Sequence, residues 1–356
     1  MEKTALIMAG GRGERFWPKS RKSLPKQFLS LTDDGKTMIQ LTVERILPLV
    51  KIENIYIATN RDYLPLIKEQ LPDLPEKNVI CEPVGRNTAP CIAVSAAIIS
   101  KKYDDALMMV LPSDHLIKYN NIYQQILTDA CEVAEKEDNL VTVGITPDYP
   151  ETGYGYIKFL NSEAIGRAYK VERFVEKPNF ELAKEYVESN EYLWNSGQFI
   201  WKVSTILNKI KEYMPETYNG AMTIRDAYDT DNYDTVLNEV FPGFPSISID
   251  YGIMEKSESI FVIPGSFGWD DVGSWLAVER IKKAGENGNI VDGNIVTVNT
   301  KNCIIQGDKK LIATVGLENI VVVDTIDATL ICNKNSTADI KKVLENLRKD
   351  NRNEYL

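Results

Sequence analysis

Residues 4–27 read TALIMAGGRGERFWPKSRKSLPKQ, an apolar run followed by a loop rich in glycine, proline and basic residues. The run at residues 4–9 has no polar alternation, which is typical of a buried parallel strand. Gly10, Gly11 and Gly13 let the backbone turn tightly and approach a ligand, so consecutive amides can bind an anion. Because open α/β sheets bind ligands at the carboxyl ends of their strands, the stretch predicts an α/β fold with an anion site after the first strand.

The charge of this segment is opposite to the charge of the whole chain. Residues 1–30 carry seven basic and two acidic residues, whereas the 356-residue chain has a net charge of −10. Arg15 and Lys26 offer a planar guanidinium and a point charge to phosphate oxygens. The segment matches neither the Walker pattern nor the dinucleotide fingerprint, so it predicts another kind of polyphosphate loop. A glycine turn beside a solvated basic face is the alternative.

The overall composition is typical of a folded protein inside the cell. Apolar residues make up 44% and charged residues 26%, and the length favours two domains. A chain this acidic is a poor candidate for binding duplex nucleic acid. The sequence shows neither a signal peptide nor a membrane span, and its cysteines share no CxxC spacing, so we expect a reduced cytoplasmic protein. The cysteines are Cys81, Cys91, Cys131, Cys303 and Cys332.

Strand and helix patterns alternate through the first half of the chain, which predicts a right-handed doubly wound sheet. Strands are predicted at residues 4–9, 54–58, 79–81, 106–111 and 140–144, and helices at 38–50, 63–71, 87–102 and 122–137. Further strands are predicted at 154–160, 169–176 and 199–203, with helices at 180–189 and within 204–240.

The pattern changes from about residue 289. Short β-branched runs recur at 295–298, 303–305, 311–315, 320–323 and 329–332, and a helix is predicted only at 338–348. Short strands at this spacing predict a β-solenoid or a small sandwich. A glycine-containing polar stretch at 285–288 marks the boundary, which gives a first domain at 1–285 and a second at 286–356.

Polar residues follow two of the predicted strands. Asp114 comes after the fourth strand, where a carboxylate suits a hard cation, although a turn aspartate is the alternative. Glu82, Asn87 and Thr88 follow the third strand, where directed hydrogen bonds can recognise base edges or ribose hydroxyls. The alternative for this segment is an ordinary strand–helix turn in which Asn87 caps the helix.

Later motifs are open to two interpretations in the same way. Glu176 and Lys177 can bind sugar hydroxyls and a phosphate, or can form a surface pair before Pro178. The Asn195–Gly197 segment could be a plain turn, and the aromatic residues around it could be core. His115 is the only histidine, which excludes sites that need two histidine ligands. A catalytic role beside Asp114 is one interpretation, but in an extended segment its side chain points to the opposite face, which favours a role in supporting the site.

Several of these segments occur together with other motifs in a recognisable order. They are Gly10-Gly11-Arg12-Gly13-Glu14-Arg15-Phe16-Trp17-Pro18, Pro25-Lys26-Gln27, Glu82-Pro83-x-x-Arg86-Asn87-Thr88-Ala89-Pro90, Pro112-Ser113-Asp114-His115, Glu176-Lys177-Pro178, Trp194-Asn195-Ser196-Gly197, Ser248-Ile249-Asp250-Tyr251-Gly252-Ile253-Met254-Glu255-Lys256 and Asp271-Val272-Gly273-Ser274-Trp275. Together they resemble the sugar-1-phosphate nucleotidyltransferase family, and are most similar to its mannose-1-phosphate guanylyltransferase branch. The resemblance covers residues 3–280 and continues more loosely beyond them.

The resemblance implies a Rossmann-like mixed-sheet nucleotidyltransferase (GT-A-like) domain followed by a small left-handed β-helix. It implies guanylyl transfer from GTP to mannose 1-phosphate with release of pyrophosphate, assisted by Mg²⁺ or another hard divalent ion. A short solenoid has exposed ends that need covering, so we expect a homodimer. The longer bifunctional relatives carry an isomerase domain for which this chain has no room, so we expect the transferase activity alone.

The resemblance also assigns roles to individual residues. Asp114 and Asp271 hold the metal, and the neighbouring Asp270 is the main ambiguity. The catalytic residues are Arg15, Lys26, Asp114 and Asp271. The nucleotide-binding residues are Ala9, Gly10, Gly11, Gly13, Glu82, Asn87, Thr88 and Ser113. The sugar-phosphate-binding residues are Tyr156, Glu176, Lys177, Asn195, Gly197 and Asp250, with Tyr251 beside them.

Two alternatives to this function remain open. The first is the same chemistry with another hexose 1-phosphate or another nucleotide, because side-chain chemistry alone does not select guanine or mannose. The second is a sugar-nucleotide sensor without catalytic activity, which the presence of Arg15, Lys26, Asp114 and Asp271 makes less favourable.

Overall fold

The computed structural model describes residues 1–11 and 13–356, so Arg12 lies outside the described residues. Internal contacts divide the chain into two compact units, each built from several stretches of sequence. The sheet unit contains Met1–Gly10, Val43–Ser113 and Ile117–Trp269. The loop–coil unit contains Gly11–Thr42, Asp114–Leu116 and Asp270–Leu356. This division differs from a single boundary near residue 285, because the N-terminal loop packs with C-terminal residues.

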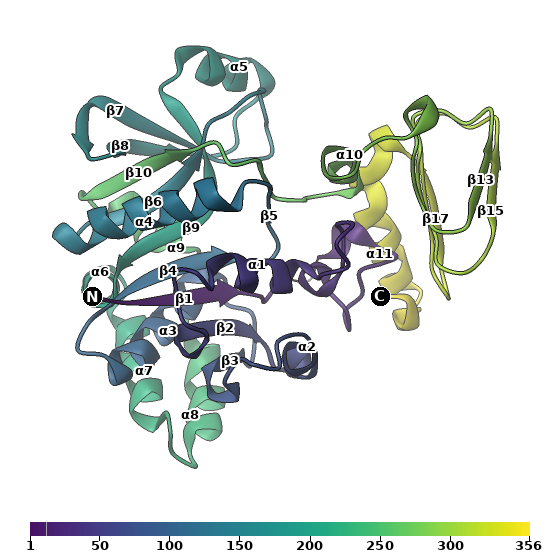
Figure 1. The fold of residues 1–356 in the computed structure, drawn as a ribbon. Helices are drawn as coiled ribbons and strands as arrows, with labels where there is room; N and C mark the ends of the chain where they lie inside the picture. The colour runs from purple at the N-terminus through teal and green to yellow at the C-terminus, as the bar shows by residue number, and fades with distance from the viewer. Residues whose placement is uncertain (12) are drawn as a thin grey trace. The chain divides into compact units, whose positions relative to one another are not determined.

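Nine strands form the central sheet of the sheet unit, in the order β3-β2-β1-β4-β9-β6-β10-β8-β7 (Figure 1). The pairings among β3, β2, β1 and β4 are parallel, as is that of β6 with β10, whereas every pairing of β7, β8 or β9 is antiparallel. The mixed sheet confirms the predicted α/β class. Its strands are β1 (Glu2–Met8), β2 (Ile55–Asn60), β3 (Val79–Glu82), β4 (Ala106–Pro112), β6 (Leu140–Ile145), β7 (Tyr156–Ile165), β8 (Ala168–Val175), β9 (Tyr192–Lys202) and β10 (Ile260–Gly265).

Helices cover both faces of this sheet. Helix α3 packs with α6 and α7 on one face, and α4 lies on the other (Figure 1). Residues from Ala89 to Ile99 of α3 are all buried, as expected for a helix enclosed by other elements. No helix in the described part of the chain is long and apolar enough to span a membrane. The helices before residue 270 are α1 (Met38–Ile46), α2 (Leu64–Gln70), α3 (Thr88–Lys102), α4 (Asn120–Lys136), α5 (Phe180–Ser189), α6 (Val203–Tyr213), α7 (Pro215–Ala227), α8 (Tyr233–Val240) and α9 (Ile249–Gly252).

Two central strands differ from the sequence prediction. Strand β9 begins at Tyr192 and includes the Asn195–Gly197 segment, which the sequence left open as a turn. Gly197 has a φ of 67°, and the register of β9 against β6 shifts nearby, so a bulge interrupts the alternation of side chains. Strand β10 is not predicted because its short apolar run carries no periodicity that separates a strand from a buried helix.

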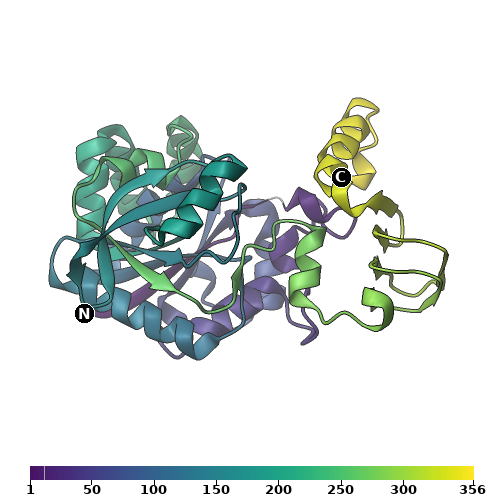
Figure 2. The same ribbon diagram turned by 90° about the horizontal axis from the view of Figure 1, so that it is seen from above.

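Short strands form a parallel coil in the loop–coil unit. Strands β12, β14 and β16 pair in parallel, with Ile304 paired to both Ile290 and Val321, and β13 pairs in parallel with β15. Parallel stacking without intervening helices indicates a β-helix-like coil rather than an antiparallel sandwich. Strand β17 pairs antiparallel with β16 and ends the stack, and α11 follows it (Figure 2). The bounds are β12 (Ile290–Asp292), β13 (Ile295–Val298), β14 (Ile304–Gln306), β15 (Ile312–Val315), β16 (Ile320–Asp324), β17 (Thr329–Asn333), α10 (Val278–Ile281) and α11 (Ile340–Lys349), with β5 (Leu116–Ile117) and β11 (Trp269–Asp270) as further short strands.

The N-terminal loop contributes aromatic side chains to the core of the loop–coil unit. Phe16 and Trp275 are both fully buried, with ring centroids 5.1 Å apart. The indole Nε1 of Trp275 donates a hydrogen bond of 3.0 Å to the carbonyl oxygen of Trp17. The same cluster contains Ile304 and Val321 of the coil. Burial of each large side chain contributes about 1.5–3 kcal/mol, so the loop and the coil stabilise one another.

Candidate active site

The carboxyl ends of neighbouring strands bring several predicted nucleotide-binding residues together in the sheet unit. Ala9 follows β1, is fully buried, and donates its amide to the carbonyl of Ala58 at 2.8 Å. Ser113 follows β4 and donates its amide to the carbonyl of Met8 at 3.2 Å. A Cβ atom at Gly10 would lie 3.4 Å from Oε2 of Glu82, at the end of β3. The sheet therefore gathers Ala9, Gly10, Glu82 and Ser113 at one edge.

Glu82 is the most strongly perturbed carboxyl group at this edge. Burial raises the pKa of Glu82 to about 7, although a hydrogen bond with Cys91 acts in the opposite direction. Its Oε1 has no hydrogen-bond partner among the residues that the structure describes. A buried, half-titrated carboxyl group with an unused oxygen is suited to binding a polar ligand, because it can accept or donate a hydrogen bond near neutral pH.

Asn87 has the capping role that the sequence allowed. Its side-chain oxygen accepts a hydrogen bond of 2.9 Å from the amide of Thr88, at the first residue of α3. The Thr88 hydroxyl accepts a hydrogen bond of 2.8 Å from the amide of Ile249. Asn87 holds a φ of 65°, an uncommon conformation for a residue other than glycine. The turn is thus fixed by its own hydrogen bonds, and nucleotide binding by these two residues stays a prediction.

A second group of predicted residues lies together around β9 and α9. The Asn195 side chain donates a hydrogen bond of 2.9 Å to Oδ1 of Asp250, and its oxygen accepts one of 3.1 Å from the amide of Gly197. Burial raises the pKa of Asp250, and the nearby charge of Glu176 adds to this effect, while the hydrogen bond from Asn195 opposes it. These residues form a small polar cluster suited to sugar hydroxyls.

Glu176 is held by a residue that lies in the same motif as Asp250. The Tyr251 hydroxyl donates a hydrogen bond of 2.6 Å to Glu176, which lowers the pKa of that carboxyl group. Lys177 is exposed. Glu255 is a carboxylate that the sequence did not single out, and its pKa is raised by burial and by the charges of Asp250 and Glu176.

Tyr156 lies in the interior of the sheet unit, and its role in sugar binding stays a prediction. The residue is fully buried, and its hydroxyl donates a hydrogen bond of 2.8 Å to the carbonyl of Glu151. Its ring packs 5.3 Å from the ring of Tyr186. Strand β7 directs this side chain into the core, where it supports the wall of the sheet unit.

Lys26 is the centre of the predicted catalytic residues in the loop–coil unit. Its side chain is 6% exposed, and its Nζ lies 2.8 Å from Oδ2 of Asp114. The same ammonium donates to the carbonyl oxygens of Asp271 at 2.6 Å and Val272 at 3.1 Å. Burial opposes ionisation of Asp114, yet the charges of Lys26 and His115 lower its pKa below the ordinary value. The structure therefore brings Lys26, Asp114 and the backbone of Asp271 to one point.

Local contacts fix the backbone of the N-terminal loop, whose role in nucleotide binding stays a prediction. Gly13 has a φ of 59°, and a Cβ atom there would lie 2.5 Å from Cβ of Lys26, so only glycine fits. The carbonyl oxygen of Gly11 accepts a hydrogen bond of 3.0 Å from the side chain of Gln27. Arg15 is exposed, with its Nη1 3.5 Å from the carbonyl oxygen of Gly273.

The pairings of Asp270 bear on the choice between the two adjacent aspartates. Asp270 is 7% exposed, and its carboxylate binds Arg280 and accepts a hydrogen bond of 2.8 Å from the amide of Val272. The Asp271 carboxylate accepts a hydrogen bond of 3.1 Å from the amide of Gly273. Asp270 is thus committed to structural contacts, which favours Asp271 as the functional carboxylate.

The oxygen ligands near Lys26 fit a hard cation. No cluster of three or more histidine, cysteine or acidic side chains suitable for a metal occurs within residues 1–11 and 13–356. Magnesium, however, is commonly held by one or two carboxylates, with water and substrate phosphates as its other ligands. The carboxylates of Asp114 and Asp271 therefore provide a donor set of the right chemistry for Mg²⁺ shared with a phosphate.

A model of the Nucleotidyl transferase family matches residues 4–287. The chain belongs to the Nucleotidyl transferase family. A second family model, the MannoseP isomerase/GMP-like beta-helix domain, matches residues 293–347, which include β13 to β17 and most of α11. Membership confirms the predicted nucleotidyltransferase family and the β-helix-like domain that follows.

Relatives of this nucleotidyl transferase chain extend over nearly all of it. Proteins named mannose-1-phosphate guanylyltransferase from Salmonella muenchen and Klebsiella pneumoniae are 41% and 40% identical over 98% of this chain, and the chain spans 74% and 75% of their lengths. A crystal structure described as mannose-1-phosphate geranyltransferase from Thermus thermophilus superimposes with a TM-score of 0.88 and 35% identity. That match covers 98% of this chain and 100% of the other.

The raised pKa of Glu82 predicts a pH dependence of stability. Ionising Glu82 costs more in the folded than in the unfolded chain, so its contribution to stability falls as pH rises from about 4.5 to about 7. The free energy of unfolding of Glu82→Gln minus that of the parent should therefore be larger at pH 8 than at pH 5. We expect this increase to be on the order of 3 kcal/mol. Urea denaturation at both pH values measures this difference.

Glu176→Gln is the matched control, because the pKa of Glu176 is lowered rather than raised. This variant is expected to show no gain in stability as pH rises. If Glu82→Gln and the parent differ in their free energy of unfolding by the same amount at pH 5 and at pH 8, the raised pKa of Glu82 is contradicted.

Proposed function

We propose that this chain transfers a guanylyl group from GTP to α-D-mannose 1-phosphate, giving GDP-mannose and pyrophosphate. The structural observation that carries the proposal is the meeting of Lys26, Asp114 and Asp271 beside the glycine-rich loop in a nucleotidyl transferase. The choice of guanine and mannose is supported by relatives of about 40% identity that are named mannose-1-phosphate guanylyltransferase.

The chemistry of this transfer matches the residue types present. A phosphate oxygen of the sugar phosphate, already ionised at pH 7, attacks the α-phosphorus of GTP. The new oxygen–phosphorus bond forms as the bond to pyrophosphate breaks, and pyrophosphate leaves with the bonding electrons. No general base is needed to generate the nucleophile, which agrees with a chain that has one histidine. The protein must instead align two polyanions and neutralise developing charge.

The loop–coil unit supplies the groups proposed to bind the triphosphate and the metal. The backbone of Gly11 and Gly13 approaches the triphosphate closely, and the exposed Arg15 binds its oxygens as a planar fork. Lys26 supplies a fixed positive charge and orients Asp114. Asp114 and Asp271 would hold Mg²⁺, which neutralises phosphate charge when bound.

The sheet unit supplies the groups proposed to recognise the base and the sugar. Glu82 has an unused oxygen that can hydrogen-bond a base edge. Glu176 and Asp250 accept hydrogen bonds from sugar hydroxyls, and Asn195 fixes the orientation of Asp250. The exposed Lys177 is placed to pair with the phosphate of the sugar substrate.

A substrate panel tests the proposed activity. Pyrophosphate release is measured for GTP, ATP, UTP and dTTP, each with mannose, glucose and galactose 1-phosphates. We expect GTP with mannose 1-phosphate to give the highest kcat/KM. A higher value for any other pair would move the chain to the first alternative, and absence of release from every pair would favour a sugar-nucleotide sensor.

The metal assignment is tested with Asp271→Asn, which keeps the size of the side chain and removes its charge. We expect turnover to fall by at least about 100-fold at saturating Mg²⁺, because charge stabilisation in the transition state is lost. Circular dichroism should show an unchanged fold. Asp33→Asn, which removes an exposed carboxylate that pairs with Lys282, is the matched control. Near-normal turnover of Asp271→Asn would overturn the assignment.

We also infer that the protein is cytoplasmic, because its five cysteines are free thiols.

We further infer that the protein forms a homodimer. Aliphatic side chains are exposed on the coil, including Val296, Val298, Val315 and Ile331. Exposed valines on parallel strands are a surface that a second copy can cover. Light scattering is expected to give twice the chain mass of 40.2 kDa, and Val315→Asp should shift the mass toward one copy. A monomer at micromolar concentration would contradict the inference.

A further inference from the structure

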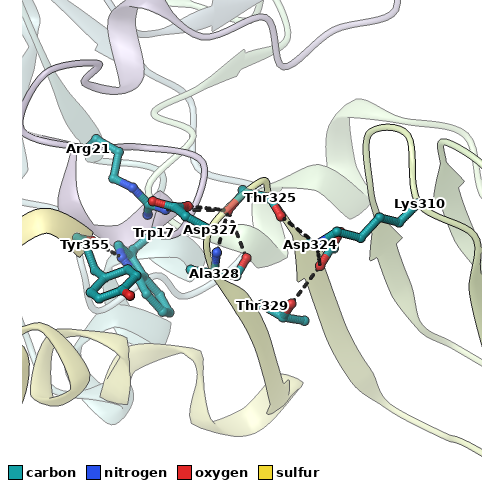
Figure 3. A network of polar contacts seen from close by, with 9 residues as sticks. All are labelled: Trp17, Arg21, Lys310, Asp324, Thr325, Asp327, Ala328, Thr329 and Tyr355. Carbon is teal, nitrogen blue, oxygen red and sulfur yellow. Dashed lines mark hydrogen bonds and ion pairs between the residues drawn. The ribbon is translucent and has the colours of Figure 1, made fainter.

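The tip of the coil binds the N-terminal loop through one ion pair. Nη2 of Arg21 donates a hydrogen bond of 2.6 Å to Oδ1 of Asp327, and it lies 3.5 Å from the hydroxyl oxygen of Thr325 (Figure 3). Asp327 lies in the turn between β16 and β17. Arg21 lies on the loop between Arg15 and Lys26. The pair therefore joins the proposed phosphate loop to a turn that is far away in the sequence.

The environment of Arg21 makes this partner important. The Arg21 side chain is only 13% exposed, and its guanidinium lies 5.6 Å from the ring centroid of Trp17. Its Nη1 has no hydrogen-bond partner in the described part of the chain. Burial opposes ionisation of Asp327, but its hydrogen bonds with Arg21 and Thr325 lower its pKa. Removing Asp327 would leave a largely desolvated guanidinium without its counter-charge, which is costly.

The turn that carries Asp327 is itself held firmly. The amide of Thr325 donates to the carbonyl of Ala328 at 2.9 Å, and the Thr325 hydroxyl is 3.0 Å from the Asp327 carboxylate. Asp324, at the end of β16, accepts a hydrogen bond of 2.6 Å from the hydroxyl of Thr329 and pairs with Lys310 (Figure 3). Asp327 is thus a fixed anchor rather than a side chain on a free loop.

On the other side of the ion pair, Arg21 belongs to a tight turn of the loop. Its amide and carbonyl form reciprocal hydrogen bonds of 3.0 Å with Leu24, immediately before Pro25 and Lys26. The preceding segment is fixed by the Trp17 Nε1, which donates to the carbonyl of Tyr355 at 2.7 Å. Arg21 therefore lies in the turn that directly precedes Pro25 and Lys26.

We propose that Asp327 is a positioning residue, which holds Arg21 so that the loop keeps its shape and presents Arg15 to the triphosphate. The inference rests on the proposed function, and it adds a role for the β-helix-like coil in nucleotide binding. Phe16, Trp17 and Lys26 hold the two ends of this segment, and Arg21 is the basic residue between them whose charge is paired with the coil. Without that pair, the segment between Trp17 and Lys26 would gain conformational freedom. Anchoring lowers the entropy that nucleotide binding must otherwise remove.

Asp327→Asn tests the proposal, because it keeps the shape of the side chain and removes the counter-charge. We expect KM for GTP to rise about tenfold, since the binding-competent loop is then populated only in part. The kcat at saturating GTP should stay within about threefold of the parent. The Kd of GTP, measured by calorimetry, should rise by the same factor as KM.

Two further variants separate positioning from general stability. Asp327→Glu keeps the charge and should restore KM to within about threefold of the parent. Asp339→Asn breaks a different ion pair of the C-terminal segment, that of Asp339 with Lys342 at 2.8 Å, which does not involve the loop. This control should leave KM unchanged. Thermal unfolding of all three variants shows how far each is destabilised.

Failure of the positioning role and failure of the proposed function give different results in these measurements. A KM for Asp327→Asn equal to that of Asp339→Asn would overturn the proposal, as would a fall in kcat and melting temperature with an unchanged KM. Failure of the parent protein to turn over GTP with mannose 1-phosphate would instead contradict the proposed function. In that case the Kd of GTP in the same variants still decides whether Asp327 positions the loop.

Discussion

The buried ammonium of Lys26 is the interaction on which the loop–coil unit depends. A buried charge is tolerated only when it is fully paired, and this one is paired with Asp114 and two carbonyl oxygens from the segment at Asp271. One cation thereby joins the N-terminal loop, the residues after β4 and the chain that enters the coil. The requirement for glycine at Gly13 follows, because the backbone passes directly against Lys26.

The coil gives that arrangement its support. Phe16 and Trp17 of the loop pack in the same core as Trp275 and the inward-facing aliphatic residues of β12, β14 and β16. Internal contacts therefore place the N-terminal loop in the same compact unit as the coil. The two family models instead divide the chain at one point in the sequence, near residue 290. A glycine-rich loop is flexible by composition, and in this protein its order comes partly from residues near the other end of the chain.

Local sequence patterns predict most of the elements but not the long-range pairings. The sequence predicts β4 from its continuous apolar run, and it predicts the strands of the coil from their repeated short β-branched runs. Strand β9 is less clear, since a bulge at Gly197 breaks its alternation. The choice of Asp271 over Asp270 came from family resemblance, and the ion pair of Asp270 with Arg280 gives it a physical reason. The burial of Tyr156 and the pairing of Arg21 with Asp327 depend on tertiary contacts, which no local pattern specifies.

We propose that the Gly11–Lys26 loop, held in place by its ion-paired lysine, binds the nucleoside triphosphate. A crystal structure with GTP and Mg²⁺ is the sharpest test of this binding mode. We expect the triphosphate to lie against the amides of Gly11 and Gly13, within hydrogen-bond distance of Arg15, with the metal bound to the carboxylate of Asp114 or Asp271. A triphosphate bound away from this loop, with neither carboxylate on the metal, would contradict it.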